Sequence, residues 1–98
     1  MGLVLVRIPD HLQEASRTLF HRKNAAWINC DGKTVWTGKL GDLATFEVDR
    51  LEEVTIFIDD GTEMATITGY VNPDCNYEVG LARYKGLFKI PEYTLFEI

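Results

Sequence analysis

The chain has 98 residues, a length that predicts one domain over residues 1–98. Its hydrophobic fraction of 46% and charged fraction of 26% are typical of a soluble globular protein. The formal net charge of −5 argues against a nucleic-acid partner, because binding to phosphates needs a concentrated positive surface.

The N-terminal stretch Met1–Ile8 is apolar but too short for the hydrophobic region of a signal peptide. No apolar run approaches the length that crosses a bilayer, so membrane insertion is not expected. These features predict a cytoplasmic protein, or an envelope protein if a signal peptide has been removed. Cys30 and Cys75 fit no metal-ligand spacing, and in the cytoplasm both would be free thiols.

The first predicted elements are a strand over Leu3–Ile8 and a short helix over Asp10–His21. Pro9 ends the strand, and Asp10 and Gln13 then form the pattern of a helix capping box. Apolar and small residues follow at the spacing of one helical face, namely Leu12, Ala15, Ser16, Leu19 and Phe20.

The stretch Ala25–Gly38 predicts a β-hairpin closed by Asp31-Gly32, because a two-residue type I′ turn favours this dipeptide. A regular register would place Cys30 opposite Lys33 and Trp27 opposite Trp36. The core side of the hairpin would then carry Ala26, Ile28, Cys30 and Val35. The two tryptophans would share the other side, either packed under a neighbouring element or exposed as an aromatic platform.

Five further strands are predicted from runs of apolar and β-branched residues between turn residues. Gly69, within one of these runs, suggests a β-bulge. Asp60-Gly61 repeats the hairpin dipeptide, and about seven to eight short strands in all predict an all-β, antiparallel sandwich or barrel, of which we favour the sandwich. The predicted strands are Ala44–Val48, Val54–Ile58, Glu63–Val71, Tyr77–Arg83 and Tyr93–Ile98.

The sequence contains no catalytic or metal-binding pattern that a turn or a solvated surface does not explain. His11 and His21 are not spaced to lie on adjacent turns of one helical face, so no metal site is expected. Asp31, Asn29 and Thr34 do not form a recognisable calcium loop. The sequence therefore predicts no catalytic residues, no metal and no cofactor.

The segment from Ala26 to Val35, with Asp31-Gly32-Lys33 at its turn, resembles the hairpin of PEGA-type domains and their small bacterial relatives of unknown function. The tail Tyr77–Ile98 is similar to the closing strands of the uncharacterised relatives. The resemblance implies an immunoglobulin-like β-sandwich with a binding or accessory role, often in envelope proteins. It implies no catalytic residues.

The main functional hypothesis is a non-enzymatic binding or accessory domain. It would bind a protein partner, or a second copy of itself, through a sheet edge or through the Trp27/Trp36 face with Tyr70. The alternative is a small-ligand-binding protein or enzyme with a pocket near the His11–His21 helix. A purely structural role in an assembly is the third hypothesis.

Overall fold

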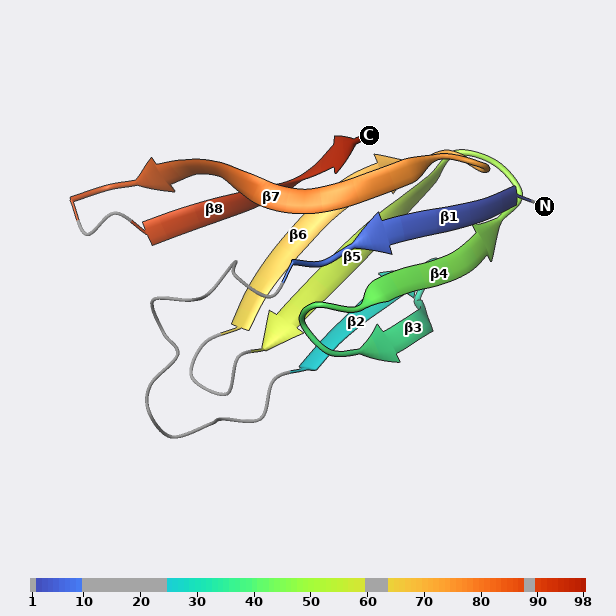
Figure 1. The fold of residues 1–98 in the computed structure, drawn as a ribbon, viewed down its shortest axis with the longest axis horizontal. Coiled ribbons are helices and arrows are strands. Elements are labelled where there is room, and N and C mark those ends of the chain that lie inside the picture. Colours follow the sequence, from blue (N-terminus) through green and yellow to red (C-terminus); the bar gives the residue numbers. More distant parts are fainter. Residues whose placement is uncertain (1, 10–24, 60–63, 88–89) are drawn as a thin grey trace.

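The computed structural model describes residues 2–9, 25–59, 64–87 and 90–98, and this part of the chain contains eight strands (Figure 1). The helix predicted for Asp10–His21 lies outside the described residues, so it is not confirmed. No helix long and apolar enough to span a membrane occurs in the described ranges. The strands are β1 (Gly2–Arg7), β2 (Ala25–Cys30), β3 (Lys33–Gly38), β4 (Leu43–Val48), β5 (Glu52–Asp59), β6 (Met64–Val71), β7 (Asn76–Lys85) and β8 (Ile90–Glu97).

The strands form two four-stranded sheets packed as a sandwich, which confirms the predicted all-β, two-layer fold (Figure 1). Sheet A has the order β4-β1-β7-β8, and sheet B has the order β3-β2-β5-β6. All neighbouring strands are antiparallel except β1 and β7, which are parallel. The prediction of a purely antiparallel fold is therefore wrong at this pair. The chain passes through sheet B before β7 returns to lie beside β1, and no hairpin joins the two.

The core lies between the sheets and is built by alternation along each strand. In β4, for example, Ala44, Phe46 and Val48 are buried, whereas the residues between them are exposed. Burial of one aliphatic side chain contributes about 1.5–3 kcal/mol, so these inward positions hold the two layers together. The largest fully buried side chains are Val4, Val6, Ile8, Ile28, Val54, Ile56, Ile58, Val71 and Val79.

The β2–β3 hairpin has the predicted turn but a different register beyond it. Asp31 and Gly32 have φ values of 52° and 75°, as a type I′ turn requires. Cys30 pairs with Lys33 and Asn29 with Thr34, as predicted, but a β-bulge then shifts the register by one residue. Ile28 consequently pairs with Trp36 and Trp27 with Thr37, so the predicted Trp27–Trp36 pair is wrong.

The bulge is explained by the side chains that it brings to the core. Val35 and Trp36 are consecutive, yet both pack against the buried cluster, which strict alternation would not allow. The indole of Trp36 lies over Gly38, where a Cβ atom would be only 2.3 Å from the ring. The predicted core side of the hairpin is confirmed, since Ala26 and Ile28 are buried and Cys30 packs against them.

Gly69 does not mark a bulge, because β5 and β6 pair in unbroken register from Glu52–Val71 to Asp59–Met64. The side chain of Leu95, on β8 of the opposite sheet, instead lies 3.2 Å from the position that a Cβ atom of Gly69 would occupy. The missing side chain thus lets the two sheets approach each other closely at this point.

Candidate functional site

The outer face of sheet B carries a polar surface with two aromatic rings at its centre. The rings of Trp27 on β2 and Phe57 on β5 are stacked, with centroids 5.2 Å apart and an interplanar angle of 12°. They are direct cross-strand neighbours, and both are half-buried. Offset stacking of this kind stabilises the pair by about 0.5–1.5 kcal/mol beyond the contribution of the buried area, so the two rings hold each other in place.

A row of hydroxyl and amide groups lies next to this aromatic pair. Asn29 pairs across the sheet with Thr55, which in turn pairs with Thr68 on the edge strand. The hydroxyl of Thr34 on β3 donates a hydrogen bond of 2.8 Å to the amide oxygen of Asn29. The row therefore presents hydrogen-bonding groups across all four strands of sheet B.

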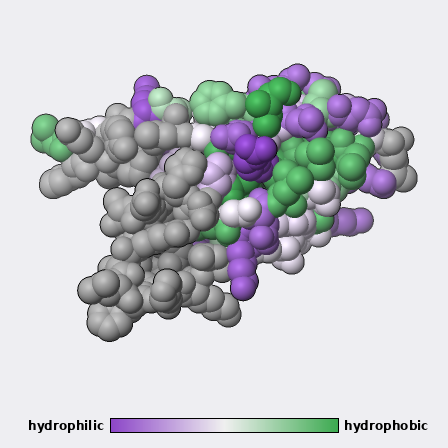
Figure 2. All heavy atoms as spheres, in the orientation of Figure 1, coloured by the Kyte–Doolittle hydropathy of each residue, from purple (hydrophilic) through white to green (hydrophobic). Residues whose placement is uncertain are grey.

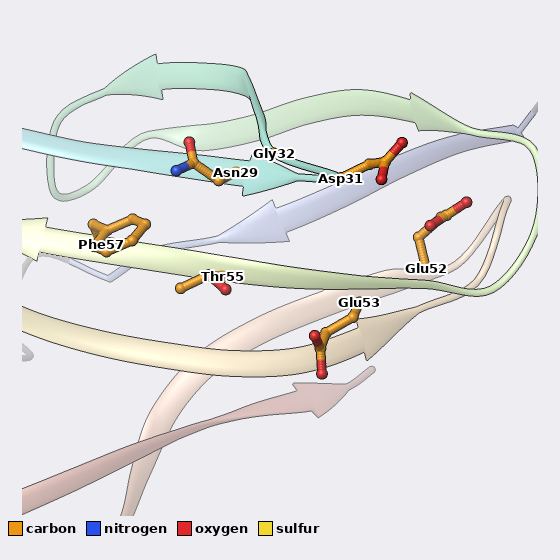
Figure 3. A pocket seen from close by; sticks show the side chains of 7 residues that line it. All are labelled: Asn29, Asp31, Gly32, Glu52, Glu53, Thr55 and Phe57. Atoms are coloured by element: carbon orange, nitrogen blue, oxygen red, sulfur yellow. The ribbon is translucent and has the colours of Figure 1, made fainter.

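An open hollow of about 430 Å³ begins at this row and ends beside the β2–β3 turn (Figure 3). Asn29, Thr55 and Phe57 line one end of it, and Figure 3 shows the carboxylates at the other end. Those carboxylates belong to Asp31, Glu52 and Glu53, and the described residues contain no group of side chains arranged to hold a metal ion. Arg50 lies 3.6 Å from Glu52, but 85% of its side chain is exposed, so this ion pair is weak.

The three residues predicted to bind a partner lie in different places. Trp27 is on the outer face of sheet B, whereas Trp36 packs against the core. Tyr70 lies on the edge strand β6, is 61% exposed and pairs directly with Glu53 of β5. The structure therefore places Trp27 and Tyr70 on one surface and removes Trp36 from it.

Two residues of this surface, Phe57 and Glu53, were missed by sequence reasoning as members of a site. The alternation in β5 puts Val54, Ile56 and Ile58 inside, so Phe57 and Glu53 fall on the outer face. An aromatic residue at an outward position was a signal in the sequence. Its contact with Trp27, however, requires β2 and β5 to pair in one sheet, and no local sequence pattern specifies that pairing.

The four edge strands of the sandwich differ in how they are protected. Natural edge strands avoid unwanted pairing through charges, proline or bulges. Strand β3 has its bulge at Val35, β4 carries the exposed Glu47, and β8 contains Pro91, which has no N–H group. Strand β6 has eight residues without a charge or a proline, and its register with β5 is regular throughout.

The direction of the backbone groups in β6 follows from the turn of the β2–β3 hairpin. Residues that flank a two-residue turn, here Cys30 and Lys33, exchange both of their hydrogen bonds. The backbone N–H and C=O groups of successive residues point to opposite sides of a strand, so those of Asn29 and Trp27 point toward β5. Their partners on β5, Thr55 among them, must point back toward β2.

The alternate residues of β5 consequently point their backbone N–H and C=O groups toward β6, where they hydrogen-bond the inward-facing residues of that strand. These residues of β5 are Val54, Ile56 and Ile58. Outward positions of β6 then direct their N–H and C=O groups away from the sheet. These positions are Thr66, Thr68 and Tyr70, whose side chains also lie on the outer face beside Trp27 and Phe57. No strand of the described ranges pairs with this edge of β6, so the edge and the outer face form one continuous surface.

The outer face of sheet A is different in character, since it combines exposed apolar side chains with paired charges. Figure 2 shows hydrophobic side chains gathered over β1 and near the C-terminal end of β8. Two ion pairs lie on this face, and in the first Arg7 lies 3.7 Å from Glu78. A second pair joins Arg83 and Glu92, 2.6 Å apart. The exposed apolar residues on these strands or beside them include Leu3, Leu43, Phe96 and Ile98.

The two cysteines are free thiols in the structure. Burial raises the pKa of the Cys30 thiol, and the negative charges of Glu52 and Asp31 raise it further. The thiol is therefore protonated at neutral pH, and a protonated thiol is a poor nucleophile and a poor metal ligand. His11 and His21 lie outside the described residues, so the alternative of a pocket near their helix stays a prediction.

Comparison of the chain with protein families, with curated proteins and with solved structures found no match.

Proposed function

We propose that this chain is a non-enzymatic protein-binding domain that adds an extended segment of its partner to the edge of β6. The observation that carries the proposal is the regular, uncharged and proline-free β6 edge, which within the described strands lacks the charge, proline or bulge found on the other edges. Strand addition at such an edge is a common mode of peptide recognition.

The expected interaction has both a backbone part and a side-chain part. Each of Thr66, Thr68 and Tyr70 would exchange two backbone hydrogen bonds with the added strand. Alternate side chains of that strand would lie on the outer face of sheet B, next to Thr66, Thr68 and Tyr70. The backbone bonds would supply affinity, and the outer face would supply specificity.

The proposal is tested by two proline substitutions at neighbouring positions of β6. Thr68→Pro removes an N–H that points out of the sheet, so the fold is expected to survive with a modest loss of stability. Ile67→Pro removes a hydrogen bond within the sheet and is expected to unfold the protein. Thermal unfolding of the two variants checks this difference and the assigned directions.

Binding is then measured with a displayed library of random octapeptides. Wild-type protein should enrich sequences with period-two alternation, whereas folded Thr68→Pro, or Thr66→Pro as a second variant, should enrich none. Equal enrichment by wild-type protein and by a folded edge variant would refute binding at β6. A library that yields no binder to wild-type protein would do the same.

We also propose that the sandwich is immunoglobulin-like and related to PEGA-type domains. Support comes from the Asp31-Gly32 turn between β2 and β3, in which both residues have positive φ. A solved structure of a PEGA-type domain with a different order of strands in its sheets would contradict this relationship.

A further inference from the structure

We infer that the strand added at β6 carries an arginine or lysine at the residue opposite Tyr70, recognised by the ring of Tyr70 and the carboxylate of Glu53. This inference rests on the proposed function and adds the chemistry of the partner. It goes beyond strand addition itself, because backbone pairing alone does not distinguish one side chain from another.

The first observation is the sign of the charge on the outer face of sheet B. Among the outward positions of its described strands only two residues are charged, and these are Glu53 and Asp59. Glu53 is exposed, and it forms no ion pair with another residue in the described part of the chain. A cationic side chain on the partner would therefore meet a complementary charge.

The second observation is the position of Tyr70 between Glu53 and the open edge. Tyr70 pairs directly with Glu53, and with 61% of its surface exposed its ring is accessible from the edge. An added strand would lie about 5 Å from β6 and about 10 Å from β5. A long basic side chain lying over the ring could reach the carboxylate while its charge remained within about 6 Å of the ring centre.

The outer face of sheet A differs from that of sheet B in the charges that it carries. There the arginines Arg7 and Arg83 are matched by Glu78 and Glu92, so cations are present on that face beside its carboxylates, which also include the exposed Glu47. Sheet B offers no arginine or lysine at an outward position of its described strands, and Glu53 and the hollow with Asp31 adjoin the row of threonines beside the β6 edge. An acidic or neutral segment would leave this charge unmatched.

A second copy of the chain is the main competing occupant, and it would satisfy the site poorly. Strand β6 contains no charged residue, so pairing of two β6 strands would place no cation opposite Tyr70. A symmetric arrangement with Thr68 opposite itself would put Thr66 there, and Glu53 would stay unmatched on both copies.

The experiment uses two labelled peptides with the length of β6, eight residues, built from alternating threonine and valine. The peptides are identical except that one has arginine and the other glutamine at one outward position near the centre. Fluorescence anisotropy measures their affinity for the full chain. We expect the arginine peptide to bind about tenfold more tightly, as the sum of an exposed cation–π contact and an exposed ion pair.

Variants of the protein then assign that preference. Glu53→Gln should reduce the advantage of the arginine peptide severalfold and leave the glutamine peptide unchanged. Tyr70→Ala should reduce the advantage too, whereas Tyr70→Phe should retain it because the ring remains. Glu47→Gln, which makes the same charge change on the edge strand β4 of sheet A, is the matched control and should change neither affinity.

The outcomes separate the inference from the proposed function. If both peptides bind equally and Glu53→Gln has no effect, the inference is wrong and strand addition at β6 stands. If neither peptide binds, the proposed function is wrong as well. If sedimentation shows a dimer that Thr68→Pro dissociates and neither peptide displaces, the occupant is a second copy and the inference is overturned.

Discussion

Gly38 shows how one missing side chain decides where a tryptophan lies. The ring of Trp36 occupies the space in which a Cβ atom of residue 38 would stand. Gly38→Ala is expected to destabilise the protein by about 1–3 kcal/mol, because the indole packs against the core and has little room to move. Urea unfolding measures the loss.

Gly80→Ala is the matched control for that substitution. A Cβ atom there would approach the ring of Phe96 at 2.8 Å, but this ring is 48% exposed and is free to rotate into solvent. Its cost should consequently be below that of Gly38→Ala. Equal costs for the two alanine variants would mean that Trp36 is not held in place by the core.

Cys30 gives the stability of the protein a defined dependence on pH. Its pKa is raised in the folded state by burial and by the nearby charges of Glu52 and Asp31. As pH rises, the unfolded chain releases the thiol proton first, so the unfolded state is favoured. The contribution of the protonated thiol is thus complete below the ordinary cysteine pKa of 9.0 and is lost as pH rises through the raised value.

The free energy of unfolding of wild-type protein and of Cys30→Ala, measured by urea titration from neutral pH to beyond 9.0, checks this prediction. The wild-type advantage over the variant should shrink across the alkaline range. Tyr77 contributes a similar alkaline loss to both proteins, because burial raises its pKa as well, and the comparison cancels it. Parallel curves would show that the thiol does not titrate differently in the two states.

At the scale of the element, the sequence predicts the strands well and their relations less well. Turn residues with positive φ, such as Asp31 and Gly41, mark strand ends locally, and period-two alternation marks the buried face of β4 and β5. The bulge in β3 was missed because it arises from tertiary burial. Val35 and Trp36 both gain by facing the core, and this gain outweighs the regular ladder that a two-residue turn favours.

The candidate surface was predictable in part, because period-two alternation assigns residues to the outer face of a strand. Trp27 and Tyr70 fall on the outward positions that alternation gives to β2 and β6. Trp36 was assigned to that face only because a regular register was assumed, and the bulge reverses its direction. The pairing of β2 with β5, which joins Trp27 to Phe57, depends on contacts far apart in the sequence, whereas Tyr70 meets Glu53 through the pairing of the consecutive strands β5 and β6.

At the scale of the whole molecule, the two sheets share one core and should unfold together. Ile56 is fully buried at the centre of sheet B, between Ile28 and Ile67 on the neighbouring strands. Ile56→Ala is expected to cost about 2–5 kcal/mol, because the cavity faces sheet A and neither sheet can collapse into it alone. Thr45→Ala, an exposed change on β4, should stay within about 0.5 kcal/mol of wild type.

The readout for this prediction compares two probes of the same urea titration. Tryptophan fluorescence reports on sheet B, which contains both Trp27 and Trp36, whereas far-ultraviolet circular dichroism reports on the strands of both sheets. Coincident transitions in wild-type protein and in Ile56→Ala would agree with a single cooperative unit. If fluorescence changed at lower urea than circular dichroism, sheet A would be keeping its structure after sheet B had opened, and the shared core would not be what holds the sandwich together.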